Sequence, residues 1–334
     1  MSLRIAIVGA GAIGGYLGVK LALSGCDVTF IARGENLKAI RSQGMKLVLE
    51  NGEALVATQA QASTIEDAQP HDYVFLTMKS HQVEPVADHI DRLCHEGTAI
   101  VTMQNGVPWW YFHQLPGEFT GARLHSVDPR GMLWDKLRPE RVVGAVVYPA
   151  AELVQPGVVQ LIEGNRFTLG EPSGEKSERI TRLAQAMIAA GFKTPVSTDI
   201  RSELWVKLWG NLTFNPVSAL THATLEDICQ FDLTREVAAR MMTEAQAVGE
   251  RLGVQFKIGI DKRIAGAQAV GAHKTSMLQD IEAGKALEIE ALLGSVIELG
   301  RITQVDTPTL RTVYALTRLL EQSVQRSGQG LRLN

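Results

Sequence analysis

The fold of this chain is decided near its start, by the stretch Ile5-Ala6-Ile7-Val8-Gly9-Ala10-Gly11-Ala12-Ile13-Gly14. An apolar run typical of a buried strand passes directly into a GxGxxG loop, and a helical pattern follows. In that setting Gly9 permits a tight turn, Gly11 leaves room for a pyrophosphate, and Gly14 lets the helix pack closely on the strand. The positive end of the helix then faces the phosphates. The stretch predicts a Rossmann-type domain that binds a dinucleotide through Gly9, Ala10, Gly11, Ala12, Ile13 and Gly14.

The end of the second strand distinguishes between the two nicotinamide dinucleotides. In NAD-binding domains an acidic residue about 20 residues after the loop binds the ribose hydroxyls. Here the position holds Arg33. A guanidinium pairs with a 2′-phosphate through two charge-assisted hydrogen bonds, whereas a carboxylate would repel it. We therefore expect NADP(H), and NAD stays open because Glu35, two residues on, could reach a ribose hydroxyl.

Composition narrows the class of protein. The 334 residues suffice for two domains, and 45% hydrophobic with 21% charged residues is typical of a globular protein. The net charge of −3, without a long basic run, gives no sign of a nucleic-acid surface. Cys26, Cys94 and Cys229 are widely spaced and suggest reduced thiols. With no signal-peptide, membrane-spanning or metal-binding pattern, we expect a cytoplasmic protein that binds no nucleic acid, no membrane and no metal.

The order of the expected elements divides the chain into two domains. Strand and helix patterns alternate over residues 1–197, which predicts a doubly wound, mostly parallel α/β sheet with an antiparallel extension. The expected strands cover residues 4–8, 28–32, 73–78, 99–103, 142–148, 158–162 and 167–169, with a hairpin at 45–50 and 54–58. Over residues 198–334 the pattern is helical, which predicts an all-α second domain. The stretch 109–141 is the least regular, and we expect loops there with at most one short helix.

Three polar residues share one face of an otherwise apolar helix in the second domain. Lys207, Asn211 and Asn215 are spaced four apart among tryptophans, leucines and a phenylalanine. Pro216 follows, and we expect the helix to bend or stop there. Unpaired buried polar groups cost about 1–3 kcal/mol each, so a ligand in a cleft is one source of partners. The alternative is that the lysine reaches solvent and the asparagines bond to nearby backbone.

A second set of polar residues lies around Gly284, which indicates a helix stop. Ser276 begins the helical pattern before it, and Glu288 lies in the opening turn of the next helix. Both could be purely structural, Ser276 as an N-cap and Glu288 as a carboxylate that stabilises the helix dipole. The pattern of residues alone leaves these alternatives open.

Together these segments resemble the ketopantoate reductase family, the 2-dehydropantoate 2-reductases. The resemblance covers nearly the whole chain and is weakest over residues 109–141. The residues that carry it are Gly9-Ala-Gly-Ala-Ile-Gly14-Gly15, Thr77-Met-Lys79-Ser-His-Gln82, Gln104-Asn105-Gly106, Lys207 with Asn211, Asn215-Pro216, and Ser276-Met-Leu-Gln-Asp280 followed by Glu288. The family reduces a 2-oxo acid with NADPH on the pathway to pantothenate and coenzyme A, and the resemblance implies that activity here.

The resemblance also implies roles for the residues around the substrate. Lys207 matches the general acid that protonates the carbonyl oxygen. Glu288 matches the glutamate that helps to set the lysine and the geometry of cofactor and substrate. Asn211 and Asn215 match the residues that bind the substrate hydroxyls, and Ser276 matches the residue that binds the carboxylate.

On the cofactor side, the resemblance implies contacts along the whole dinucleotide. Arg33 matches the arginine that binds the 2′-phosphate. Lys79 and Gln82 match contacts on the adenosine side, and Asn105 matches the asparagine near the nicotinamide ribose. Ala150 falls where a backbone contact to the cofactor is usual.

The chain departs from the family pattern at two positions. An asparagine that is common near Thr224-Leu225 is missing, and His273 stands where another is common. Both usually help to hold the distal hydroxyl of ketopantoate. His273 could replace one bond or be a plain surface residue. Two alternatives stay open, namely reduction of another, bulkier or aromatic, 2-oxo acid and a non-catalytic NADP(H)-binding sensor. We expect a small-molecule substrate and a monomer or homodimer.

Overall fold

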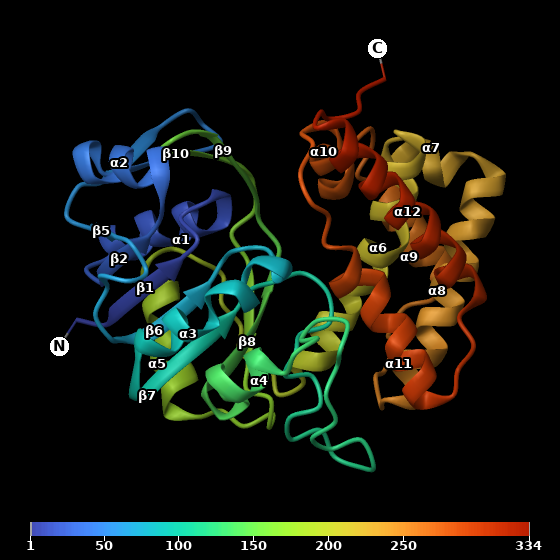
Figure 1. The fold of residues 1–334 in the computed structure, drawn as a ribbon, viewed down its shortest axis with the longest axis horizontal. Helices are drawn as coiled ribbons and strands as arrows, with labels where there is room; N and C mark the ends of the chain where they lie inside the picture. Colours follow the sequence, from blue (N-terminus) through green and yellow to red (C-terminus); the bar gives the residue numbers. More distant parts are fainter. Residues whose placement is uncertain (1, 334) are drawn as a thin grey trace. The chain divides into compact units, whose positions relative to one another are not determined.

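The computed structural model describes residues 2–333, which form two compact units (Figure 1). The N-terminal unit comprises the chain up to Gln104 with Pro108–Arg123 and Arg130–Ile200, and the C-terminal unit comprises Asn105–Val107, Leu124–Pro129 and the chain from Arg201. The division after Ile200 lies slightly beyond the boundary expected at 197. Two short segments expected in the first domain belong to the second unit.

A seven-stranded sheet forms the centre of the N-terminal unit. Its strand order is β11-β8-β7-β6-β1-β2-β5, and every neighbouring pair is parallel except β8 with β11. The strands are β1 (Arg4–Val8), β2 (Asp27–Ile31), β5 (Gln61–Ser63), β6 (His71–Leu76), β7 (Cys94–Thr102), β8 (Val142–Val147) and β11 (Phe167–Gly170). The doubly wound, mostly parallel sheet with an antiparallel extension is therefore confirmed.

A second, four-stranded sheet covers α1 (Ala12–Leu23) within the same unit. Its order is β4-β3-β10-β9, and its strands are β3 (Met45–Val48), β4 (Ala54–Ala57), β9 (Ala150–Gln155) and β10 (Val158–Glu163). The expected hairpin is the β3–β4 pair, whereas β9 was not expected. A Cβ on Gly15 would lie 2.3 Å from Met45 Cε and 2.6 Å from Val159 Cγ2, so that glycine allows the sheet to pack on the helix.

The irregular stretch 109–141 contributes core rather than only loops. Trp110, Tyr111 and Phe112 are at most 1% exposed, and Trp110 Nε1 donates to Thr102 Oγ1 at 2.8 Å. The expected short helix is α4 (Met132–Leu137), followed by a 3₁₀ turn (Pro139–Arg141). The other helices of the unit are α2 (Gly34–Gln43), α3 (Ala87–Arg92) and α5 (Glu178–Ala189).

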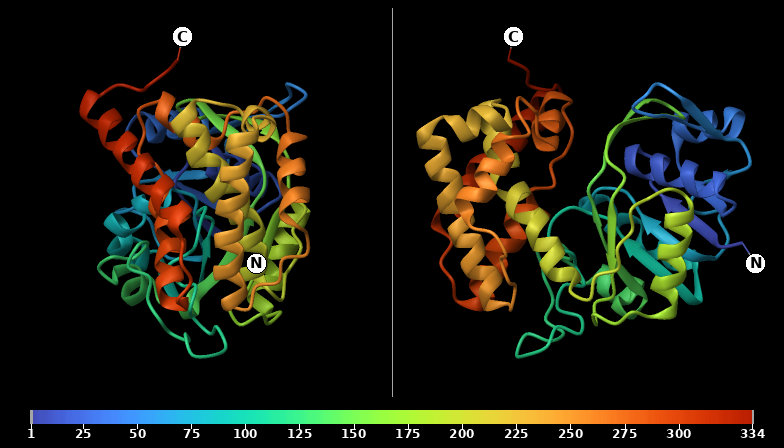
Figure 2. Two further views of the ribbon diagram at one scale, coloured as in Figure 1. Left: turned by 90° about the vertical axis from the view of Figure 1, so that its right-hand side faces the viewer. Right: turned by 180° about the vertical axis from the view of Figure 1, so that it is seen from behind.

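The C-terminal unit is helical, as predicted. Its elements are α6 (Ile200–Thr221), α7 (Leu225–Gln230), α8 (Asp232–Arg251), α9 (Ile260–Gln268), α10 (Ser276–Glu282), the π-helical turn η4 (Glu290–Gly294), α11 (Ser295–Thr303) and α12 (Pro308–Ser327). Figure 2 shows α8 and α12 side by side within this unit. Trp209 is part of its core, because it is 1% exposed, packs on Phe256 and donates from Nε1 to the Met242 carbonyl at 2.8 Å.

The prediction that α6 bends or stops at Pro216 is wrong in its second part, since the helix continues to Thr221. Proline removes one backbone donor and crowds the preceding turn. Here the residues on both sides of Pro216 are buried, with Asn215 7% and Val217 5% exposed. Packing of this turn against its neighbours offsets the intrinsic penalty of the proline.

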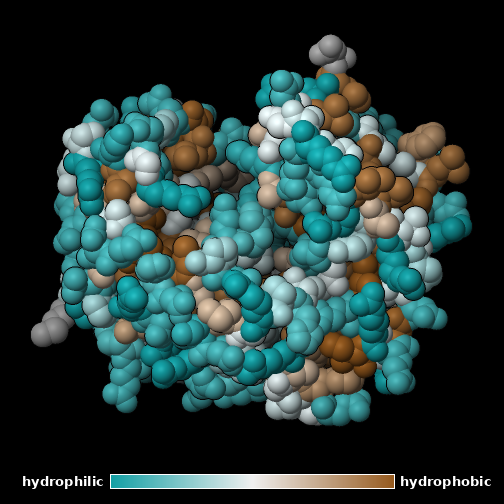
Figure 3. Space-filling model, in the orientation of Figure 1, coloured by the Kyte–Doolittle hydropathy of each residue, from teal (hydrophilic) through white to brown (hydrophobic). Residues whose placement is uncertain are grey.

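The outer surface of the C-terminal unit carries several exposed apolar side chains. Phe231, Leu233, Leu316 and Leu319 are each more than half exposed. Figure 3 shows apolar side chains on the side of this unit where Figure 1 labels α7, α8 and α12. Over residues 2–333, no helix combines the length and the hydropathy that a membrane span requires.

Candidate active site

The glycine loop between β1 and α1 has the geometry that the sequence predicts. Gly9 has φ +103°, and a Cβ there would lie 3.0 Å from the Met78 backbone nitrogen. A Cβ on Gly14 would lie 2.2 Å from the Gly9 carbonyl oxygen. By contrast, a Cβ on Gly11 would meet nothing within 4 Å. The loop is therefore tight at its ends and open at Gly11, which fits a pyrophosphate at the helix N-terminus.

Two side chains that the sequence analysis left without a role hold this loop in place. Thr77 Oγ1 donates to the Gly9 carbonyl at 2.7 Å. Asn36 Nδ2 donates to the Ala10 carbonyl at 2.7 Å, while its Oδ1 accepts from Gly157 N at 2.7 Å. Thr77 lies in the matched Thr77-Met-Lys79 segment, whereas Asn36 has no local signal because its partners are distant in sequence.

The two residues that compete for the ribose end of a dinucleotide differ in their partners. Arg33 is exposed at the N-terminus of α2, and its side chain has no hydrogen bond or ion pair within residues 2–333. Glu35 is paired with Lys38 at 2.7 Å. The guanidinium is therefore available for a phosphate, while the carboxylate already has a cation beside it.

The remaining residues of the N-terminal unit that were predicted to contact the cofactor lie on two other segments. Gln82 Oε1 accepts from Lys79 N at 3.1 Å, which orders the 3₁₀ turn after β6. Ala150 begins β9, where it pairs with Glu163. The structure thus places these residues on ordered backbone, and their contacts to a cofactor stay predictions.

In the C-terminal unit, one asparagine connects the predicted lysine and glutamate. Lys207 Nζ donates to Asn105 Oδ1 at 2.7 Å, and Asn105 Nδ2 donates to Glu288 Oε2 at 3.3 Å. Three residues separated by up to 183 positions in sequence therefore form one cluster, which we call the Lys207–Asn105–Glu288 triad. The sequence predicted all three members, but it placed Asn105 at the nicotinamide ribose and gave no sign of this bridge.

The environment of Lys207 changes its acidity. Burial lowers the pKa of Lys207 to about 8, and the Glu288 carboxylate partly opposes this by favouring the ammonium. A group with this pKa is mainly protonated at neutral pH and releases its proton far more readily than an exposed lysine. This is the property expected of a general acid.

The other polar residues of the α6 face extend along the helix from Lys207. Asn215 is 7% exposed, and its Nδ2 donates to Ser276 Oγ at 3.4 Å. Asn211, one turn closer to Lys207, has no side-chain hydrogen bond within residues 2–333. The structure brings Asn215 and Ser276 together and leaves the Asn211 amide available to a ligand.

Ser276 is not the N-cap of its helix, which was the structural alternative for this residue. The N-cap of α10 is Thr275, whose hydroxyl accepts from Leu278 N at 3.3 Å. Ser276 is the next residue and is exposed. Glu288 directly precedes the helical stretch that begins at Ile289 and contains η4. The helix therefore starts one residue later than expected, and Glu288 lies just before its opening turn. His273 is exposed, which is consistent with a plain surface residue.

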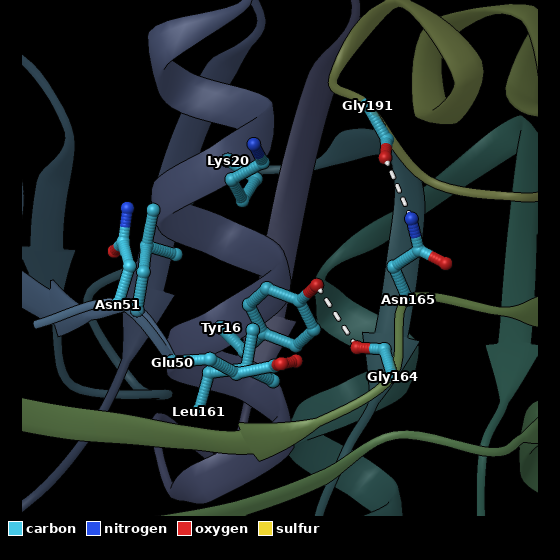
Figure 4. A pocket seen from close by; sticks show the side chains of 9 residues that line it. Tyr16, Lys20, Glu50, Asn51, Leu161, Gly164, Asn165 and Gly191 are labelled. Atoms are coloured by element: carbon cyan, nitrogen blue, oxygen red, sulfur yellow. Dashed lines mark hydrogen bonds between the residues drawn. The ribbon is translucent and has the colours of Figure 1, made fainter. Parts of the chain in front are cut away.

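A separate surface pocket of about 370 Å³ lies beside α1 (Figure 4). Tyr16 and Lys20 from the helix line it, together with Glu50 and Asn165. Tyr16 donates to the Gly164 carbonyl at 3.3 Å, and burial together with the Glu50 charge raises the pKa of Tyr16 to about 12. No predicted site residue lines this pocket. Among residues 2–333, no group of three His, Cys, Asp or Glu side chains is arranged to hold a metal ion.

Comparison with known proteins matches both units to one family. A family profile described as "Ketopantoate reductase PanE/ApbA" matches residues 5–174. A second, described as "Ketopantoate reductase PanE/ApbA C terminal", matches residues 199–321. The chain belongs to the ketopantoate reductase family. The resemblance drawn from the glycine loop, the α6 face and the Ser276–Glu288 segment is confirmed.

Individual relatives agree with this assignment. A 2-dehydropantoate 2-reductase of Mesorhizobium japonicum is 54% identical over 319 residues, which are 95% of this chain and 98% of that protein. The crystal structure of a Ralstonia solanacearum protein assigned as a ketopantoate reductase aligns with a TM-score of 0.92 at 39% identity, over 97% of this chain and 99% of that chain. D-mandelate dehydrogenase with NADH and anilino(oxo)acetate aligns with a TM-score of 0.82 at 21% identity, over 96% and 99%, and shares the fold alone.

Proposed function

We propose that this protein reduces 2-dehydropantoate to pantoate with NADPH, a step towards pantothenate and coenzyme A. The observation that carries the proposal is the Lys207–Asn105–Glu288 triad, because a protein that only binds a dinucleotide has no need of a lysine linked through an amide to a carboxylate. The 54% identical relative has the same activity in its name, and its family is NADPH-dependent.

Residues of the N-terminal unit are suited to both the pyrophosphate and the 2′-phosphate of NADPH. The open space at Gly11 and the helix N-terminus suit the pyrophosphate, and the unpaired Arg33 suits the 2′-phosphate. Lys79, Gln82 and Ala150 would add contacts along the nucleotide. When bound, the cofactor supplies a hydride to the carbonyl carbon of the substrate.

The triad supplies the proton that completes the reduction. The Lys207 ammonium donates one proton to the carbonyl oxygen, and its positive charge stabilises the negative charge that develops there. The Asn105 carbonyl accepts from Nζ and orients it, while Glu288 holds Asn105 in the required rotamer. The amine that remains regains its proton from water.

Along the α6 face, polar groups are suited to the rest of the substrate. Asn211 and Asn215 would bind hydroxyls, and Ser276 would bind the carboxylate. The Asn211 amide has no competing partner in residues 2–333. The chain lacks the family asparagines near Thr224-Leu225 and at His273, so selectivity for ketopantoate rests on fewer asparagines than is usual in the family.

Oxidation of NADPH, followed at 340 nm with a panel of 2-oxo acids, tests the proposal. We expect the highest kcat/KM with 2-dehydropantoate and a much lower value with aromatic 2-oxo acids. A preference for an aromatic 2-oxo acid would show that the protein reduces that substrate instead. Tight NADPH binding without turnover of any acid would indicate a non-catalytic NADP(H)-binding sensor. We also expect the protein to act in the cytoplasm as a monomer or homodimer.

A further inference from the structure

The segment that carries Glu288 is attached to α12 on both sides of that residue. On one side, Leu287 N donates to Glu321 Oε1 at 2.8 Å. On the other, Tyr314 Oη donates to Glu290 Oε1 at 2.8 Å. Glu288 lies between these two attachment points, so α12 holds the backbone on one side of the glutamate and the Glu290 side chain on the other.

One arginine connects the two attachment points. Arg318 Nη1 donates to Glu321 Oε2 at 2.7 Å, and Arg318 Nε lies 3.3 Å from Glu290 Oε1. Glu321 is 5% exposed, and its two carboxylate oxygens are used separately, one on Leu287 N and the other on Arg318. A buried carboxylate needs both partners to offset its loss of water.

The π-helical turn that follows Glu288 supports Asn105, the residue that links the other two members of the triad. The Ala291 carbonyl accepts from Val107 N at 2.9 Å and from Ser295 Oγ at 2.7 Å. A Cβ on Gly106 would lie 2.1 Å from that carbonyl oxygen, so only glycine allows this approach. Asn105 is therefore held next to Glu288 by backbone that packs on η4. Single π-turns within helices are often found at functional sites.

We propose that Glu321, held by Arg318, is a positioning residue for the Lys207–Asn105–Glu288 triad. It acts through the backbone of Leu287, which sets the place of Glu288, and it touches neither substrate nor cofactor. The expected effect of Glu321 on turnover rests on the proposed function. Its effect on the triad itself can be measured without turnover.

The test compares three variants on α12. Glu321→Ala removes both contacts, Glu321→Gln keeps an acceptor for Leu287 N, and Gln322→Ala is a control at the adjacent exposed position. Because misplacing a catalytic group by about 1 Å can cost about 100-fold, we expect Glu321→Ala to lower kcat by about 10-fold to 100-fold. Glu321→Gln should recover part of this loss, and Gln322→Ala should match the wild type. The Kd for NADPH should stay unchanged in all three.

The readout that separates positioning from mere stability is the titration of Lys207. In protein labelled with ¹³C at lysine Cε, the Lys207 resonance can be assigned with Lys207→Arg and followed against pH. When Glu288 moves away, its charge no longer favours the ammonium, so the pKa of Lys207 should fall below about 8 in Glu321→Ala. An unchanged pKa with an unchanged kcat would overturn the proposal, as would equal losses in Gln322→Ala.

The outcomes also distinguish this role from the activity. If the wild type turns over no 2-oxo acid but the Lys207 titration still responds to Glu321→Ala, the proposed function fails and the positioning role stands. If turnover is as expected and the titration does not respond, the positioning role fails alone. Should Glu321→Ala fail to fold, Arg318→Ala decides, because it keeps the Glu321 carboxylate and removes the arginine that holds it, so kcat and the pKa of Lys207 should both fall again.

Discussion

Replacing Glu288 by glutamine is the most informative change to the triad, because it removes a charge and keeps an acceptor for Asn105. Lys207 has a pKa of about 8, lowered by burial and partly restored by Glu288. An opposite charge within about 4–6 Å favours the charged form by about 1–3 pKa units, and Glu288 is joined to Lys207 through Asn105. Glu288→Gln should therefore lower the pKa of Lys207 below about 8.

The sign of the effect on the rate follows from the role of an acid. Reduction needs the ammonium, so wild-type kcat should be highest below pH 8 and fall above it. If the pKa falls by about two units, the protonated fraction at pH 7 drops from about nine tenths to about one tenth. The reverse reaction, oxidation of the alcohol, needs the neutral amine and should gain at neutral pH instead.

The assay is the pH profile of kcat for NADPH oxidation under saturating substrate. Glu250→Gln, an exposed carboxylate on α8, serves as a control for the loss of one negative charge. Glu288→Gln should move the alkaline limb to lower pH and leave the low-pH plateau within a few-fold of the wild type. An alkaline limb that stays near pH 8 would refute the electrostatic coupling between Glu288 and Lys207.

Three further predictions concern other parts of the site. Arg33→Ala should raise the KM for NADPH by about 10-fold or more and leave the KM for NADH unchanged, because hydrogen bonds to a charged group contribute about 1.5–3 kcal/mol. The control Lys38→Ala should change neither KM. An unaltered preference for NADPH in Arg33→Ala would exclude the phosphate contact. Gly106→Ala should lower the thermal midpoint and kcat together, because its Cβ would lie 2.1 Å from the Ala291 carbonyl oxygen and its φ is +92°. A Gly106→Ala variant as stable as the wild type would show that the close contact between Gly106 and Ala291 is not needed. Asn211→Ala should raise the KM for the 2-oxo acid without loss of thermal stability, and an unchanged KM would remove it from the substrate site.

Local sterics explain which parts of the fold could be read from the sequence. The close packing at Gly14 is largely local, since a Cβ there would lie 2.2 Å from the Gly9 carbonyl oxygen, and Gly11 meets no atom within 4 Å; at Gly9 the segment after β6 adds a contact with Met78 that favours the same glycine. Local preference also explains the start of α12 at Pro308, because proline is favoured in the first turn of a helix. These features agree with the prediction because no distant contact competes with the local preference.

The features that the sequence did not predict depend on distant contacts. α6 passes through Pro216 because the surrounding turn is buried, and β9 exists because β10 offers it a partner. The π-helical turn at Ala291 and the bridge through Asn105 join residues more than 180 positions apart. Local propensity carries no information on such contacts, so the residues of the triad were predictable and their mutual geometry was not.

The central claim is that the Lys207 ammonium delivers the proton, and paired measurements on Lys207→Ala test it most directly. We predict that kcat for reduction falls by about 10²–10⁴-fold, while the Kd for NADPH, measured by fluorescence titration, changes by less than about threefold. The lysine acts on the carbonyl oxygen, so cofactor binding does not require it. Equal losses in turnover and in cofactor affinity, or a kcat close to the wild type, would contradict the account.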